Sequence, residues 1–512
     1  MGHHSHQTYS KRRGGLARWC GFLSVCVVYA TVLVTPSEAQ PFRELPDPAT
    51  FQWRDLTNEL RNKMTGVYTV TSGGDFLWRN PINKRISPEL RDVMRNADTT
   101  IGNLESQIID PRNCVSPCSL AGSWLPKEAA QGYADLGVDF LAPGEFNGGL
   151  TGHLSSQQYL EEVGIKMSGA GRNLTIARQP VFQELPQGRV AMLTACPGIY
   201  CGPAAANDEG MRGTERPGVN PLRLTVWTTV TATQFEQLKA IRESILARRH
   251  EPDVLIPTDM PRDRPGHLTL LGERFVIGDK PGEFRYEINP NDEQAQILAV
   301  RNAKQLSDFV MFTMHNHTNR YAYQAYSHDS YPADFMRPFI HKLIDNGLDM
   351  YVGHGSHTMQ GIEIYKGRPI FYNHGNLGDD RFGPEDSPPN PGNLTNTERL
   401  ERNWAWIQGE ENSIAFLANS RYQDGRLVEI RIYPADLGLV GEPRRPLSRA
   451  NIPLTPSPAK AREILEKIQK YSEPFGTKIS IENNIGIIRV PPEATVEIGG
   501  DLVLPGRGPT SK

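Results

Sequence analysis

Short apolar segments alternate with helix-forming segments through most of this 512-residue chain. The apolar runs at residues 190–194 and 309–314 are typical of buried strands, whereas residues 292–306 and 336–346 carry apolar side chains at helical spacing. This alternation predicts an α/β fold, because each helix buries one face against a neighbouring sheet. Further strands are expected at 67–71, 99–104, 138–142, 350–352, 414–417 and 427–432, and further helices at 127–136, 155–163, 234–248 and 459–471. Ser87 and Pro88 are expected to open another helix, with Ser87 as its N-cap.

The composition is that of an ordinary globular protein. Hydrophobic residues make up 38% of the chain, charged residues 22%, and the net charge is −3 at pH 7. The hydrophobic fraction supports a sizeable core and argues against a disordered chain. The charge balance argues against a nucleic-acid-binding protein, which would normally carry a basic face.

The first 39 residues have the pattern of a secretory signal. Basic residues between Lys11 and Arg18 precede an apolar run at 19–34, and small residues at Ser37 and Ala39 mark a cleavage site. We therefore expect an exported protein, periplasmic or extracellular after cleavage near Ala39. The alternative is an uncleaved membrane anchor, although this apolar run is shorter than the roughly 20 residues that a spanning helix needs.

Four cysteines remain after the leader, and they fall into two close pairs. An even number of cysteines in an exported protein favours disulfides, and the spacing favours Cys114–Cys118 and Cys196–Cys201. The alternative is a pair of zinc ligands at each position, which export makes less favourable.

Acidic and imidazole side chains recur where predicted strands end. Asp75 and Glu105 follow two such strands, His315 follows a third, and His354 and His357 follow a fourth. In open α/β sheets, ligands bind outside the carboxyl ends of the strands. Imidazole and carboxylate groups suit zinc, manganese or iron, so the pattern predicts a site for one or two divalent ions that could promote hydrolysis.

The distribution of histidines strengthens this prediction, because seven of the thirteen lie between His315 and His374. His328 lies in a polar segment and His341 within a predicted helix, so we interpret both as structural. His317 and His374 remain candidates for the site.

Several motifs, in order, resemble the CapA family, which is linked to poly-γ-glutamate capsule synthesis and belongs to the calcineurin-like metallophosphatase superfamily. The similarity covers roughly residues 65–480 and rests on Gly73-Gly74-Asp75, Asn103-Leu104-Glu105, residues 169–173, the strand ending at His315, residues 349–363, residues 368–376 and the helix at 459–476.

The resemblance implies a four-layer α/β/β/α sandwich of the metallophosphatase type, completed by C-terminal strands and a helix. It also implies that the metal ligands are Asp75, Glu105, His315 and either His354 or His357.

The sequence departs from the family pattern after the strand that ends at Ala142. The family usually has Asn-Asn-His there, whereas this chain has Pro143-Gly144-Glu145, with Asn147 two residues further on. Glu145 is therefore a candidate catalytic acid or base in an altered loop.

Three further positions depart from the family. Gly355 stands where His is usual, His317 where Gly is usual, and His374 where Leu is common. We favour a rebuilt site, in which Glu145, Asn147, His317 or His374 takes over lost roles, with His317 as a second candidate acid or base and His374 as a candidate ligand. The alternative is a degenerate site that binds one metal ion or none.

These observations lead to a domain plan. We expect a signal peptide at 1–39, an N-terminal segment at 40–64, a CapA-like domain at 65–400 with a possible insertion at 203–290, the C-terminal part of the same fold at 401–503 and a loose tail at 504–512.

Two functions remain open. The first is an exported metal-dependent hydrolase acting on phosphoester or γ-glutamyl amide bonds, with a small molecule or a polymer such as poly-γ-glutamate as substrate. The second is a non-catalytic envelope component that binds or helps export an anionic polymer, with membrane subunits of capsule synthesis as partners.

Overall fold

The computed structural model describes residues 60–78, 85–109, 124–144, 149–198, 205–208, 215–248, 264–321, 329–379, 410–438 and 452–496. The predicted leader, Glu145, Asn147 and His328 lie outside these residues, as do all cysteines except Cys196. Cys196 is disulfide-bonded, but both predicted pairings involve cysteines outside the described residues and stay predictions.

The larger sheet has nine strands within the described residues. β20 (Asn376–Asp379) pairs beside β1, and the other strands follow the order β23 (Ser480–Glu482), β24 (Ile485–Arg489), β22 (Arg426–Asp436), β21 (Ile414–Gln423), β1 (Val67–Leu77), β2 (Thr99–Leu104), β5 (Phe140–Pro143) and β6 (Lys166–Met167). β1, β2 and β5 are parallel, so their carboxyl ends lie at one edge. The C-terminal strands join this same sheet, because β21 pairs antiparallel with β1.

The smaller of the two main sheets has seven described strands. β8 (Val181–Leu185) pairs beside β9, and the order is β11 (Pro221–Leu222), β9 (Gly188–Pro197), β16 (Phe309–His315), β17 (Met350–His354), β19 (Arg368–Phe371) and β18 (Ile362–Tyr365). β9, β16, β17 and β19 are mutually parallel.

The two sheets face each other across a shared apolar core. Val70 and Phe140 of the larger sheet pack with Met192, Met311 and Val352 of the smaller one. Every residue of β16 is buried, and because side chains alternate along a strand, both of its faces are covered. This explains the continuous apolar run at 309–314, which is typical of a parallel strand covered on both sides.

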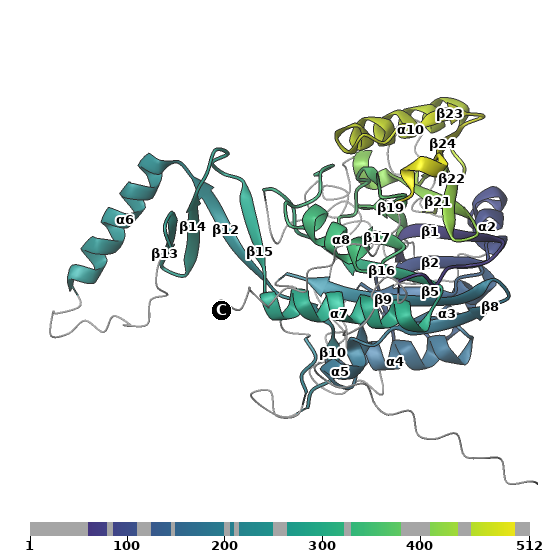
Figure 1. Cartoon of the computed structure of the whole chain (residues 1–512), viewed down its shortest axis with the longest axis horizontal. Coiled ribbons are helices and arrows are strands. Elements are labelled where there is room, and N and C mark those ends of the chain that lie inside the picture. The colour runs from purple at the N-terminus through teal and green to yellow at the C-terminus, as the bar shows by residue number, and fades with distance from the viewer. Residues whose placement is uncertain are drawn as a thin grey trace, which may run out of the picture. The chain divides into compact units, whose positions relative to one another are not determined.

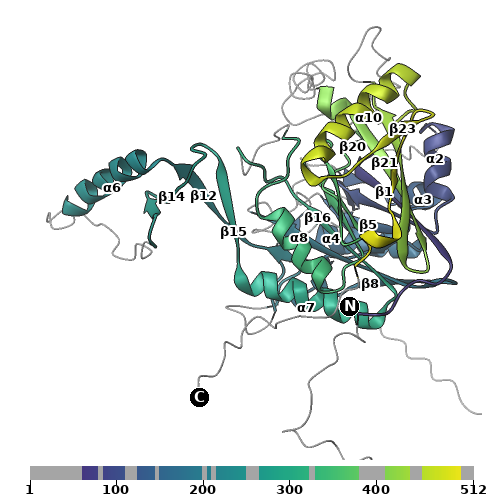
Figure 2. The ribbon, with the colours of Figure 1, turned by 45° about the horizontal axis from the view of Figure 1, so that its top comes forward.

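Helices cover the outer face of each sheet (Figures 1 and 2). α2 (Pro88–Arg95), α3 (Glu128–Asp135) and α4 (Gly149–Glu162) contribute Leu90, Tyr133 and Leu160 to a core on the larger sheet. α7 (Pro290–Leu306) and α8 (Met336–Asp345) contribute Val300 and Phe339 to a core on the smaller sheet. The order is helix, sheet, sheet, helix, which confirms the predicted α/β/β/α sandwich.

The helix near the C-terminus packs differently from the outer helices. α10 (Pro458–Ser472) inserts Ile464, Leu465 and Ile468 into the core between the sheets. Ser457 caps it by accepting a hydrogen bond from the Lys460 N–H.

A four-stranded sheet occupies much of the region predicted as a possible insertion. Its order is β13 (His267–Leu270), β14 (Glu273–Ile277), β12 (Leu224–Val230) and β15 (Phe284–Ile288), and α6 (Ala232–Ala247) packs on it through Phe235. Hydrophobic periodicity is weak in this region because these strands are short and only partly buried. The remaining described elements are β3 (Gln107–Ile108), β4 (Trp124–Leu125), β7 (Ala170–Gly171), β10 (Gly218–Val219), α5 (Leu174–Ala177), η3 (Glu410–Ser413), η4 (Glu473–Phe475) and η5 (Pro492–Ala494).

Two local expectations differ from the structure. Ser87 precedes α2 as predicted, but its side chain makes no cap and its Oγ lies 2.9 Å from Thr455 Oγ1. The apolar face predicted for 234–248 is largely open, because Ile241 is 50% exposed. None of the described helices is long and apolar enough to cross a membrane.

Candidate metal centre

The strand ends of both main sheets meet at one place. Asp75 lies near the end of β1, Glu105 directly follows β2, and His315 and His354 are the last residues of β16 and β17. The contact between the sheets is direct, because Asn103 Nδ2 lies 2.9 Å from Asp75 Oδ1 and 3.1 Å from His315 Nδ1. These strand ends therefore lie together where the two main sheets meet.

Asp75 is fully buried and is surrounded by hydrogen-bond donors. Besides the Asn103 amide, the Gly355 N–H donates to both carboxylate oxygens at 3.1 Å. Gly355 has a φ of +96°, and a Cβ there would lie 2.8 Å from the Asn316 backbone nitrogen. Glycine at 355 is therefore required by this backbone.

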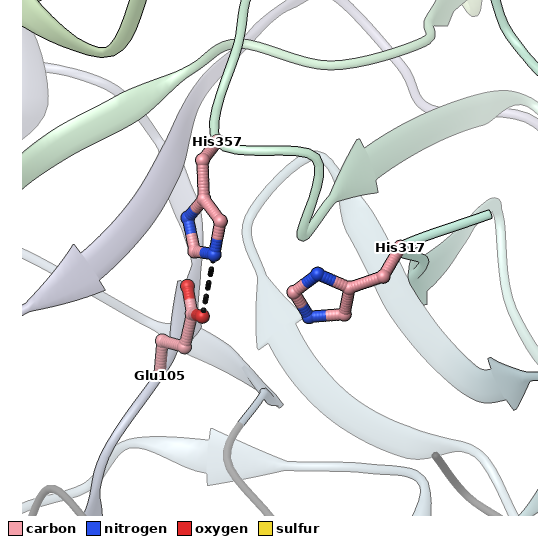
Figure 3. A group of neighbouring side chains, drawn as sticks. All are labelled: Glu105, His317 and His357. Carbon is pink, nitrogen blue, oxygen red and sulfur yellow. Dashed lines mark ion pairs between the residues drawn. The ribbon is translucent and has the colours of Figure 1, made fainter. Parts of the chain in front are cut away.

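His357 faces Glu105 across the centre (Figure 3). Its Nε2 lies 3.2 Å from Glu105 Oε1, and its Nδ1 lies 2.8 Å from Asn376 Oδ1. The backbone of His357 has a φ of +57°. A non-glycine residue rarely adopts this left-handed conformation, and such residues cluster at functional sites.

His317 points into the same region from the segment after β16 (Figure 3). Its Nε2 lies 2.8 Å from His315 Nε2, and its ring centroid lies 5.3 Å from that of His357. We expected His317 to act as a catalytic acid or base, but the structure places it among the ligand candidates.

Two groups of possible ligands share one carboxylate. Asp75, Glu105 and His315 form one group, and Glu105, His317 and His357 form the other; in each, one ligand atom per residue lies within 4.8 Å of the others. Two ligands of one zinc ion lie roughly 3.0–3.5 Å apart when each bond is about 2.1 Å. The His357–Glu105 contact of 3.2 Å matches that spacing, so this donor set fits a divalent ion.

Burial favours the neutral form of His315, His317 and His354. It lowers the pKa of His317 and of His354 to about 3, and burial together with the neighbouring imidazoles holds the pKa of His315 well below its ordinary value. A neutral imidazole is the form that binds metal ions. At neutral pH, these three rings therefore need not release a proton before an ion binds.

His354 and His374 lie together beside this centre. Their ring centroids are 6.4 Å apart, and His374 Nε2 lies 2.9 Å from Ser72 Oγ. Burial also holds the pKa of His374 well below its ordinary value. Among the described residues, neither imidazole belongs to the two groups of ligand candidates that share Glu105.

Three other predicted or related residues can be placed. His341 stacks on Tyr365 and lies 3.1 Å from Glu363 Oε1, which agrees with a structural role. Asn103 and Asn376 contact the site but were not recognised as functional residues, although both lie within the motifs that suggested the family. An amide gives little sequence signal, because only its neighbours in space reveal its role.

Comparison with known proteins relates the chain to bacterial capsule synthesis proteins. Residues 69–381 match the family of the bacterial capsule synthesis protein PGA_cap. The chain is 31% identical over 474 residues to the uncharacterised protein y4sH of Sinorhizobium fredii, covering 85% of this chain and 96% of the relative. It is 32% identical over 113 residues to the PGA biosynthesis protein CapA of Bacillus subtilis, covering 22% and 26%.

A solved structure from Staphylococcus aureus, described as a 5′-nucleotidase, aligns with a TM-score of 0.31 and 9% identity. The alignment covers 70% of this chain and about half of the other, at 52%. Similarity at this level carries no argument about activity.

Proposed function

Because the chain belongs to the bacterial capsule synthesis PGA_cap family, we propose that it is an exported metal-dependent hydrolase of capsule or poly-γ-glutamate metabolism. The bond that it cleaves is a phosphoester or a γ-glutamyl amide. The name of the Bacillus subtilis relative supports the connection with poly-γ-glutamate, and the leader-like first 39 residues support export.

The observation that carries this proposal is the pair of ligand groups that share Glu105. Five side chains from segments far apart in the chain converge there: Asp75, Glu105, His315, His317 and His357. All are buried except His317, which is partly exposed. Burying two carboxylates without a compensating cation is costly, so the cluster is better explained by a metal function than by stability.

Each residue has a definite task in this proposal. Asp75, Glu105, His315, His317 and His357 would hold one or two divalent ions, with Glu105 between the two groups. When bound, a divalent ion supplies Lewis acidity toward a phosphoryl or carbonyl oxygen and lowers the pKa of water. The Asn103 amide and the Gly355 N–H orient Asp75.

Activity assays with matched variants test the proposal. Purified protein, supplied in turn with zinc, manganese and ferrous iron, is assayed on a chromogenic phosphodiester and on a γ-glutamyl anilide. We expect turnover of one of them, its loss with chelator, and a decrease of at least about 100-fold in Glu105→Gln and His317→Asn. His267→Asn is the control, because His267 lies in the separate four-stranded sheet.

The same experiment distinguishes the other function. No turnover with any metal, together with retention of poly-γ-glutamate on a column carrying the protein, would replace the hydrolase with a polymer-binding component of the envelope. Equal activity of wild type, E105Q and H317N would show that any hydrolysis occurs elsewhere in the molecule.

A further inference from the structure

Asp75 has an asparagine neighbour on each side in the larger sheet. Its Cα partner on β2 is Asn103, and its Cα partner on β20 is Asn376. Because residues in register on neighbouring strands point to the same face, the three side chains form one row across the sheet. Each asparagine contacts one imidazole of the metal centre, Asn103 contacting His315 and Asn376 contacting His357.

The contact of Asn376 determines which nitrogen of His357 carries its proton. Asn376 Oδ1 lies 2.8 Å from His357 Nδ1, and a carbonyl oxygen can only accept a hydrogen bond. A second oxygen, Asp75 Oδ2, lies 3.6 Å from the same nitrogen. Two oxygens around Nδ1 favour a proton on that atom. With Nδ1 protonated, Nε2 is the nitrogen that would offer its lone pair to an ion held beside Glu105.

The lone pair then points toward the centre. His357 Nε2 lies 3.2 Å from Glu105 Oε1, the carboxylate shared by the two ligand groups. If the proton were on Nε2 instead, it would occupy the position needed for an ion. Outer hydrogen bonds to a ligating histidine commonly fix its ring orientation in this way.

We infer that Asn376 is a positioning residue that holds the proton of His357 on Nδ1 and directs Nε2 toward the divalent ion. The inference rests on the metal centre of the proposed function. His357 has a left-handed backbone with φ +57°, and Asn376 Oδ1 is an acceptor within hydrogen-bond distance of its ring. The hydrogen bond to Asn376 fixes the direction in which the His357 ring points.

Zinc titration of the full-length metal-free protein by calorimetry tests this role. Asn376→Leu keeps the volume but removes the acceptor, so we expect zinc affinity to fall about 10- to 100-fold. Asn376→Asp keeps an oxygen acceptor, so we expect its affinity to stay within about threefold of wild type. Asn62→Leu, at an exposed position outside the site, is the control.

Nitrogen-15 NMR of the imidazoles supplies a second measurement that a purely structural role would not change. The His357 signals, identified by their absence from His357→Asn, should show a protonated Nδ1 in wild type and Asn376→Asp. They should show a mixed or reversed tautomer in Asn376→Leu. If Asn376→Leu does not fold, Asn376→Ser, whose hydroxyl is too short to reach Nδ1, replaces it.

The outcomes separate this inference from the proposed function. Wild-type zinc affinity in Asn376→Leu, or an equal loss in Asn376→Asp and Asn376→Leu, would overturn the positioning role. An unchanged His357 tautomer in Asn376→Leu would do the same. If wild type binds no zinc, the proposed function fails, and the NMR measurement alone then decides whether Asn376 sets the tautomer.

Discussion

At the scale of single residues, the centre combines buried carboxylates with neutral imidazoles. Strand-end reasoning identified Asp75, Glu105, His315 and His357 because polar side chains after apolar runs are conspicuous in a sequence. The same reasoning treated His354 as equivalent to the others, and the departure from the family pattern added His374, yet both lie outside the ligand groups described above. Sequence spacing places a residue at a strand end but cannot specify which direction its side chain takes after the turn.

His354 offers a test at this scale. Both of its ring nitrogens are buried and have no hydrogen-bond partner among the described residues. Replacing His354 by Leu removes these unsatisfied groups, so we expect the free energy of unfolding of the metal-free protein to rise by about 1–2 kcal/mol. Zinc affinity should remain within about threefold of wild type. A loss of affinity of about tenfold or more, measured by calorimetry, would instead identify His354 as a ligand.

Asp139 makes the stability of the fold depend on pH. Burial raises its pKa to about 6, although its carboxylate accepts hydrogen bonds from the Thr100 N–H and the Gln183 amide. A carboxyl whose pKa is raised on folding stabilises the protein at low pH, and this contribution is lost as the pH rises through about 6. Allowing for its partial exposure, the effect is about 2 kcal/mol.

Asp139→Asn removes this titration. The difference in unfolding free energy between the variant and wild type should therefore grow by about 2 kcal/mol in favour of the variant between pH 4 and pH 7.5. Urea denaturation at several pH values measures it, with the exposed Asp92→Asn as control. A difference that does not change with pH would contradict the account.

At the scale of elements, apolar runs buried on both faces were the most predictable. β16 and β17 lie where the sequence placed them, because parallel strands covered on both sides read as continuous apolar segments. The strands β12 to β15 were not predicted, since their side chains are only partly buried and give weak periodicity. The helix α6 was predicted correctly. The prediction that its apolar face is buried was wrong, because most of that face is uncovered.

The contribution of α10 can be measured directly. Leu465 is fully buried in the core between the sheets, so Leu465→Ala should lower the free energy of unfolding by about 2–5 kcal/mol. Arg462→Ala on the same helix, at a side chain that is 65% exposed, should change it by less than about 0.5 kcal/mol. Equal effects of the two changes in urea denaturation would show that α10 does not stabilise the sandwich.

At the scale of the whole molecule, the sandwich itself creates the centre. Asp75 and Glu105 come from the larger sheet, whereas His315 belongs to the smaller one, so neither sheet alone can assemble the ligand groups. The fold class followed from the alternation of strands and helices. Asn103 joins the two sheets, because it contacts Asp75 in one and His315 in the other. Asn103 and His315 are more than 200 positions apart, so no local sequence pattern predicts this contact.

The most direct test of the central claim is elemental analysis of the full chain purified without chelator. We expect stoichiometric zinc, manganese or iron in wild type and in the His267→Asn control, and little metal in Glu105→Gln and His317→Asn. A wild type that carries and binds no more divalent metal than Glu105→Gln would contradict a metal centre at this junction of the two sheets.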